Sequence, residues 1–190
     1  MNVQPARGHL FRATALFCLA FAWTAANSGP AQTMGKTKMQ LTSTAFTEGQ
    51  PIPADYTCEG KNVSPPLQWS GAPASTKSLA LIVDDPDAPV GTWVHWVLYN
   101  LPAGANQLPE NASRTPSATG SAAQGLNDFK RSGYSGPCPP PGKPHRYFFK
   151  LYALDIELQL KRDPTKKDVE KAMQGHILAE GRLVGTYQRK

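Results

Sequence analysis

Asp84-Asp-Pro-Asp-Ala-Pro-Val-Gly-Thr-Trp-Val-His-Trp96 is the stretch that decides the fold, because it connects two apolar runs. Residues 78–83 before it are almost continuously apolar, which predicts a central strand with both faces buried. Residues 92–101, which begin inside this stretch and continue beyond it, predict a second strand whose two faces are both apolar. Two prolines stiffen the connection, so we expect a rigid loop that holds acids at strand ends, a common place for small-ligand sites.

The alternation of side chains along the second strand predicts an interior histidine. Successive residues of a strand point to opposite faces, so one face is expected to contain four side chains: Trp93, His95, Val97 and Tyr99. Because the opposite face is apolar as well, His95 is expected in an interior setting rather than on an open surface.

Three further segments complete the predicted strands. Residues 39–46 alternate like a short strand, residues 145–155 form a third strong strand, and residues 183–187 predict a last short one. Residues 102–144 have little regular pattern, which indicates a segment that is either functional or disordered.

One helix is predicted near the C-terminus. Thr165 and Asp168 have the spacing of a capping box, and an apolar stripe follows that includes His176 and Ile177, with Gly181 as the end of the helix. His176 on this stripe is interpreted as a packing residue rather than a ligand. The fold class that follows is mostly β, one domain with one clear helix.

The N-terminal segment has the parts of a secretory signal peptide. Arg7 and Arg12 precede an apolar run at residues 13–23, which is too short to cross a bilayer of about 30 Å as a helix. A buried N-terminal helix is the alternative. We predict a signal peptide at residues 1–33, a single domain at 34–190, and a periplasmic or secreted protein. Loss of the two arginines and no acids would lower the formal charge from +6 to +4.

The cysteines and the charge distribution limit the kinds of site and partner that the chain is expected to have. Cys58 and Cys138 remain after the predicted leader, and in an oxidising compartment they form either a disulfide or two separate thiols. Their spacing is unlike a zinc site. The basic residues are scattered, which does not favour nucleic-acid binding but is compatible with weak contact to an anionic membrane surface.

Polar groups from separate segments could form an anion pocket if the segments meet. Asp85 and His95 belong to the opening stretch, Gly136 to a later turn, and His145 and Tyr147 to one face of the third strand, about 7 Å apart along it. Imidazole and phenol groups can donate to phosphate oxygens, and a carboxylate can orient an imidazole. Acid–base or metal-assisted hydrolysis by the same groups is the alternative, although no nucleophilic Ser or Cys stands beside a base.

Several motifs together resemble the phosphatidylethanolamine-binding protein family, most closely its bacterial Raf-kinase-inhibitor-like branch. The motifs are Asp85-Pro-Asp-Ala-Pro89, Trp93-Val-His95, Gly136-Pro-Cys-Pro-Pro-Pro-Gly142 and His145-Arg-Tyr147, and the resemblance covers about residues 38–188. It implies an antiparallel β-sandwich with a helix near the C-terminus, and a pocket for phosphate or phosphorylethanolamine. It also implies a cis peptide bond before Pro89. The pocket residues implied are Asp85, Trp93, His95, Gly136, His145 and Tyr147.

The resulting hypothesis is an exported small-ligand binding protein of this family, not an enzyme, with no cofactor. Its expected partner is a small anion or a phospholipid head group, and no protein partner is specified. Two alternatives stay open: an enzyme that uses the Asp/His/His/Tyr cluster, and a protease or kinase inhibitor that acts through surface loops.

Overall fold

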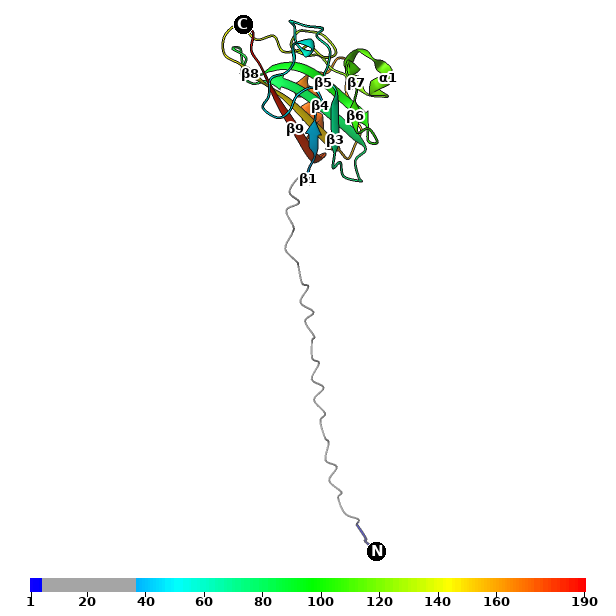
Figure 1. Cartoon of the computed structure of the whole chain (residues 1–190). Helices are drawn as coiled ribbons and strands as arrows, with labels where there is room; N and C mark the ends of the chain where they lie inside the picture. Colours follow the sequence, from blue (N-terminus) through cyan, green and yellow to red (C-terminus); the bar gives the residue numbers. More distant parts are fainter. Residues whose placement is uncertain (5–36) are drawn as a thin grey trace. The chain divides into compact units, whose positions relative to one another are not determined.

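A computed structural model describes residues 1–4 and 37–190 of the 190-residue chain. The chain divides into two units, residues 1–34 and 35–190, and the second contains every helix and strand described below (Figure 1). The predicted signal peptide lies almost wholly outside the described residues and stays a prediction. In the described part of the chain, no helix is long and apolar enough to cross a membrane.

The domain is built on two sheets. The larger has the strand order β1 (Thr37–Lys38), β9 (Ile177–Tyr187), β8 (His145–Leu154), β4 (Ser78–Asp85), β5 (Trp93–Pro102) and β7 (Ala123–Gln124). The smaller has the order β2 (Gln40–Thr42), β3 (Leu67–Ser70) and β6 (Gln107–Leu108). Among these strands, only β1 and β9 pair in parallel.

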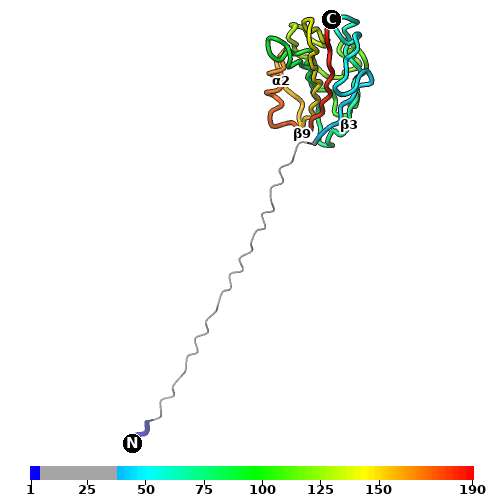
Figure 2. The backbone as a smooth tube through the Cα atoms, turned by 60° about the vertical axis from the view of Figure 1, so that its left-hand side comes forward, coloured from blue at the N-terminus to red at the C-terminus, as the bar shows by residue number. Residues whose placement is uncertain are grey.

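Short helices occupy the connections. They are the 3₁₀ turns η1 (Ala54–Tyr56) and η2 (Ala112–Arg114), the single-turn helix α1 (Pro116–Thr119) and the helix α2 (Lys166–Met173). Figure 2 shows α2 and β3 on opposite sides of β9, so the large sheet lies between the helix and the smaller sheet. The predicted class, a β-sandwich with a helix near the C-terminus, is confirmed.

Two apolar cores explain this layering. The main core joins side chains from both sheets, among them Leu67, Trp96 and Phe149, while the second core joins β4 and β5 to Val169 and Met173 of α2. Every residue of β4 is buried, as expected for a central strand covered on both faces. Burial of each large aliphatic or aromatic side chain contributes about 1.5–3 kcal/mol, so these cores hold the layers together.

β5 contains a β-bulge at His95. Val83 of β4 pairs with Trp96, but the next residue, Asp84, pairs with Val94, so His95 is an extra residue without an opposite partner. A bulge of this kind re-aims side chains and is frequent beside functional sites.

The bulge changes which residues share a face. His95 packs against Tyr147 of the main core and Trp96 lies in that core too, whereas Val97 and Tyr99 belong to the core under α2. The prediction that Val97 and Tyr99 share the face of His95 is therefore wrong, because strict alternation along the sequence does not allow for an inserted residue.

The C-terminal helix is shorter than predicted. Its capping box is present, with Thr165 and Asp168 bonded reciprocally, but the helix ends at Met173 and β9 begins at Ile177. Gly175 has a φ of +81°, which allows the turn between them. Pairing of ten residues of β9 with β8 prevails over the local helical periodicity.

Two other residues assigned to that helix have different roles. His176 does not pack on a helix face but lies with Nδ1 2.9 Å from Asp155 Oδ1 on the surface. Gly181 lies within β9, where an added Cβ would come 3.1 Å from Met39 Cβ, so it serves close packing instead of ending a helix.

Candidate functional site

One small cavity collects most of the predicted site residues. It has a volume of about 190 Å³ and lies where the β4–β5 loop meets the start of β8 and the segment after β7. Its lining residues are Asp85, Ala88, Pro89, Val90, Trp93, His95, Phe129, Cys138, Pro139, Pro140, His145 and Tyr147. Two larger grooves, of about 700 and 630 Å³, run beside β1 and β9 and contain none of the predicted site residues.

Gly136 is the predicted site residue that does not line the cavity. Its N–H donates to Asn62 Oδ1 over 2.7 Å, so this donor is engaged inside the protein. A Cβ at this position would lie 2.2 Å from the carbonyl oxygen of Tyr56, which explains why only glycine fits. Gly136 thus allows the wall of the cavity to approach the 54–62 loop.

Asp85 and His145 form a buried carboxylate–imidazole pair. Asp85 lies at the last position of β4 and His145 at the first position of β8, and antiparallel pairing brings these two strand ends together. His145 Nδ1 is 2.8 Å from Asp85 Oδ2, and the other carboxylate oxygen accepts the N–H of Asp87 over 2.8 Å. The pair orients the imidazole toward the cavity that both residues line.

His95 is held between two aromatic rings. Its ring centroid is 5.2 Å from that of Tyr147 and 5.4 Å from that of Phe129, both in edge-to-face arrangements. Nδ1 lies 2.6 Å from the carbonyl oxygen of Ser135, which fixes the ring orientation. Burial lowers the pKa of His95, so its neutral form is favoured.

Tyr147 has an unpartnered hydroxyl group. Its Oη is buried and has no hydrogen-bond partner of good geometry among the described residues, although the Asp85 carboxylate acts on it. Burial, and then the nearby Asp85 carboxylate, raise the pKa of Tyr147, so the phenol keeps its proton. A buried hydroxyl without a partner is costly by about 1–3 kcal/mol and is a natural place for a ligand oxygen.

The other two acids of the opening stretch brace the structure. Asp87 accepts from the guanidinium and the backbone N–H of Arg146 at 2.7–3.0 Å. Hydrogen bonds from Arg146 lower the pKa of Asp87 to about 2. Asp84 is buried and lies close to the ammonium groups of Lys150 and Lys166. Neither acid lines the cavity.

The loop before Pro89 differs from the family expectation. No peptide bond among the described residues is cis, so the expected cis bond between Ala88 and Pro89 is not present. The pairing of Asp87 with Arg146 and the Asx turn of Asp85 hold this loop in place.

Sequence reasoning missed the segment at residues 127–129. Asn127 is buried and its Nδ2 donates to backbone oxygens of His95 and Gly133, Asp128 accepts the N–H of Val94 over 2.8 Å, and Phe129 lines the cavity. The available signal was a polar pair followed by an aromatic residue, Asn-Asp-Phe, inside an otherwise irregular stretch. It could not be linked to His95 without the tertiary fold.

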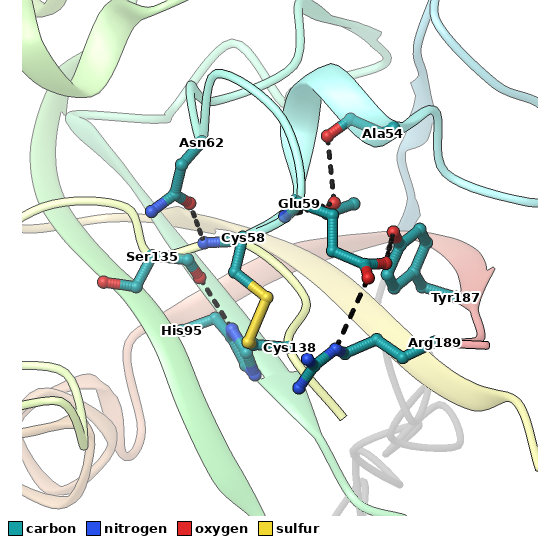
Figure 3. Close-up of a disulfide and its surroundings, with 11 residues drawn as sticks. Ala54, Cys58, Glu59, Asn62, His95, Ser135, Cys138, Tyr187 and Arg189 are labelled. Carbon is teal, nitrogen blue, oxygen red and sulfur yellow. Dashed lines mark hydrogen bonds and ion pairs between the residues drawn. A yellow bond between two sulfur atoms is a disulfide. The ribbon is translucent and has the colours of Figure 1, made fainter. Parts of the chain in front are cut away.

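The disulfide predicted as one of two possibilities is present. Cys58 and Cys138 are bonded, with Cα atoms 5.4 Å apart, and the Cys58 N–H donates to the carbonyl oxygen of Pro137 over 3.0 Å. Figure 3 shows the disulfide beside His95 and Ser135, with Asn62 on the same loop as Cys58. Because Cys138 lines the cavity, the bond ties one wall of the site to the 54–62 loop.

The arrangement suits binding of a small polar group. The polar groups of the lining side chains are one carboxylate, two imidazoles, one phenol and the indole N–H of Trp93, surrounded by apolar side chains and the disulfide. Among residues 1–4 and 37–190, no group of three or more His, Cys, Asp or Glu side chains is arranged to hold a metal ion. The groups present can donate, accept and move protons.

Comparison with known proteins identifies the family. The family model described as phosphatidylethanolamine-binding protein matches residues 42–188. A UPF0098 protein of Methanothermobacter thermautotrophicus is 50% identical over 151 residues, which cover 80% of this chain and 99% of that protein. A UPF0098 protein of Aquifex aeolicus is 48% identical, covering 80% and 89%.

Two solved structures agree with this result. CT736 of Chlamydia trachomatis, described as a phosphatidylethanolamine-binding protein homolog, is 46% identical with a TM-score of 0.74. Escherichia coli YBCL, described as a new member of the mammalian family, is 36% identical with a TM-score of 0.75. Each comparison covers 80% of this chain and 99% of the other. This chain therefore belongs to the phosphatidylethanolamine-binding protein family.

Proposed function

We propose that the protein binds a small oxyanion, such as phosphate or the phosphoryl group of phosphorylethanolamine, in the cavity between His95 and His145. The observation that carries this proposal is the buried, unpartnered Oη of Tyr147 beside two imidazoles. A ligand oxygen at this point would satisfy the hydroxyl and accept from a protonated imidazole.

The rim of the cavity supports a phospholipid head group as one source of that anion. Val90 is 79% exposed and Phe129 36% exposed, and both line the cavity. In the domain from residue 37 onward they are the exposed large apolar side chains. An apolar rim around a polar interior fits an amphiphile and weak contact with a membrane surface.

Export belongs to the same proposal. The N-terminal pattern of basic residues followed by a short apolar run favours secretion, and the Cys58–Cys138 disulfide suits an oxidising compartment. We propose a periplasmic or secreted protein. The first residue of the protein isolated from the periplasm, read by mass spectrometry, tests this; an intact Met1 would contradict cleavage.

A titration tests the binding site. Purified residues 34–190 are titrated with phosphate and with phosphorylethanolamine while the ring resonances of the histidines are followed by NMR. We expect His95 and His145 to shift and His176, paired with Asp155 on the surface, to stay unchanged. Unchanged His95 and His145 resonances at millimolar concentrations of both ligands would refute the proposal.

An enzyme is the second candidate, because one observation favours it. The Asp85–His145 pair has the geometry that orients an imidazole for general acid–base work, and Tyr147 lies in the same cavity. Hydrolysis of phosphate monoesters that is lost in H145Q and kept in H176Q would establish this candidate. Ligand binding without turnover supports the binding protein.

A further inference from the structure

Both cavity histidines have the same ring nitrogen engaged by an acceptor. His95 Nδ1 faces the carbonyl oxygen of Ser135 and His145 Nδ1 faces the carboxylate of Asp85. A carbonyl or an ionised carboxylate only accepts, so Nδ1 carries the hydrogen in each ring. Each neutral imidazole therefore keeps Nε2 as an acceptor, and both rings line the cavity.

The cavity lining contains no lysine or arginine. When Asp85 is a carboxylate and each ring carries its hydrogen on Nδ1 alone, the lining has one negative charge and two nitrogen lone pairs. The phenol of Tyr147 and the indole N–H of Trp93 are then the uncharged side-chain donors in this lining, and no cation accompanies them. A fully ionised anion would meet repulsion from Asp85 and from two acceptors.

The charges around the cavity do not change this balance. The nearby cations are already paired: Arg146 of β8 with Asp87 of the β4–β5 loop, and Lys150 of β8 and Lys166 of α2 with Asp84 of β4. From the segment after β7, Asp128 accepts a backbone N–H, and the exposed Lys130 is not part of the lining. The buried phenol of Tyr134 donates to a backbone oxygen.

The surroundings of His95 favour a neutral ring in the free protein and can accommodate a cation. Burial lowers the pKa of His95, while the carbonyl oxygens of Ser135 and Gly136 and the carboxylates of Asp85 and Asp84 act in the opposite direction. An anion placed beside Nε2 would add to that second group and favour the imidazolium.

We propose that the cavity takes up its oxyanion together with a proton, which resides on an imidazole Nε2 or on the anion itself. This inference rests on the proposed function, because it concerns the same site. The ligand class is an oxyanion whose complex with the protein contains one added proton. That proton forms a hydrogen bond between the anion and an imidazole, either as Nε2–H or as the ligand's own O–H. In the pH range where neither the free protein nor the free anion carries that proton, the affinity for the anion then falls about tenfold per pH unit.

Isothermal titration calorimetry in buffers with different ionisation enthalpies tests the proposal. At pH 8 the dependence of the observed heat on the buffer gives the number of protons taken up. We expect about one proton per phosphate bound. Sulfate, which stays a dianion throughout this pH range, shows where the proton resides: uptake with both anions assigns it to the protein, and uptake with phosphate alone assigns it to the ligand.

The outcomes separate this inference from the proposed function. Binding heats that do not depend on the buffer would overturn the proton uptake and leave the anion site standing. Absence of binding between pH 5.5 and pH 8 would overturn both. The comparison uses the natural sequence of the domain, so it does not depend on the folding of any variant.

Variants then assign the proton to one ring. Glutamine can donate a hydrogen bond without titrating, so H145Q and H95Q are expected to bind sulfate with less proton uptake, the larger loss marking the residue that is protonated. H176Q is the matched control, since His176 also faces a carboxylate, 2.9 Å away, but lies outside the cavity. Because sulfate cannot carry the proton, equal proton uptake with sulfate in all three variants and in the natural sequence would place the proton on neither ring and overturn the proposal.

Discussion

At the scale of single residues, the cavity combines groups that are individually unfavourable. His95 is buried without a charged partner in direct contact, and the hydroxyl of Tyr147 is buried without a hydrogen bond to the described residues. Asp85 in turn uses both carboxylate oxygens to hold a neighbour. Groups that lower the stability of the ligand-free protein in this way are expected at a binding site, where the ligand supplies their missing hydrogen-bond partners.

Removal of the hydroxyl of Tyr147 should separate stability from binding. In Y147F the unpartnered Oη is gone, so the ligand-free domain should be as stable as before or more stable, by up to about 1 kcal/mol. Phosphate affinity should fall about fivefold to tenfold, because a hydrogen bond of about 1–1.5 kcal/mol is lost. Thermal unfolding and calorimetry measure the two effects.

Tyr134 provides the control for that variant. Its hydroxyl donates to the carbonyl oxygen of Tyr56 over 2.8 Å, so Y134F should lower the free energy of unfolding by about 1 kcal/mol. If Y147F is destabilised as much as Y134F, the hydroxyl of Tyr147 has a hydrogen-bond partner inside the protein, which would contradict its being unpartnered.

Asp87 should contribute an acid-sensitive part of the stability. Its pKa is lowered to about 2 by Arg146, so the folded state favours the ionised form. The contribution of ionised Asp87 to the free energy of unfolding is complete above the pH range in which an ordinary carboxyl group titrates. It is lost as the pH falls through about 4 toward 2. D87N should therefore be less stable at pH 6, by up to about 1 kcal/mol for an exposed pair, and equal near pH 2, as urea unfolding would measure. An equal deficit at both pH values would contradict this origin.

At the scale of elements, sequence periodicity located the long central strands but neither their faces nor the other strands. Residues 39–46 are a strand only at Gln40–Thr42, and the predicted short strand at 183–187 is the end of β9. The central strand at residues 78–83 was evident because a buried strand is continuously apolar. The face of Val97 was not, because the bulge at His95 depends on pairing with β4, which alternation does not encode. The end of α2 was misplaced for a similar reason, since β9 forms through non-local pairing with β8. Local rules predicted the start of the helix, which depends only on Thr165 and Asp168.

The capping box gives a prediction at this scale. Thr165 caps α2 by accepting the N–H of Asp168, so T165A should lower the free energy of unfolding by about 1 kcal/mol. Thr115, which precedes α1, makes no such side-chain cap, and T115A should cost less. Chemical denaturation measures both variants; an equal loss would mean that the cap of α2 contributes little.

At the scale of the whole molecule, the family motifs predicted which segments converge but not how they are held. Five of the six predicted residues line one cavity, and the sixth, Gly136, lies behind its wall. The missed residues, such as Phe129, come from the irregular part of the chain, where no periodicity exists to be read. The pairing of Cys58 with Cys138 could be considered from the sequence, but only the fold brings their Cα atoms within 5.4 Å.

Loss of the disulfide should affect the entire domain. The two cysteines are separated by 80 residues, so replacing both with alanine should lower the free energy of unfolding by about 2–5 kcal/mol. The wall from Cys138 to Pro140 should also become less ordered, which weakens phosphate binding. Denaturation and calorimetry on C58A/C138A measure both; unchanged phosphate affinity would show that hydrogen bonds alone, such as Cys58 N–H to Pro137, fix the wall.

The pairing of β1 with β9 also has a consequence for the order of folding. These are the first and the last strands of the chain, and they lie side by side in the large sheet. This edge of the sheet cannot form until Ala179 and Glu180, the partners of Thr37 and Lys38, have left the ribosome. The large sheet therefore stays incomplete until almost the whole domain has been synthesised.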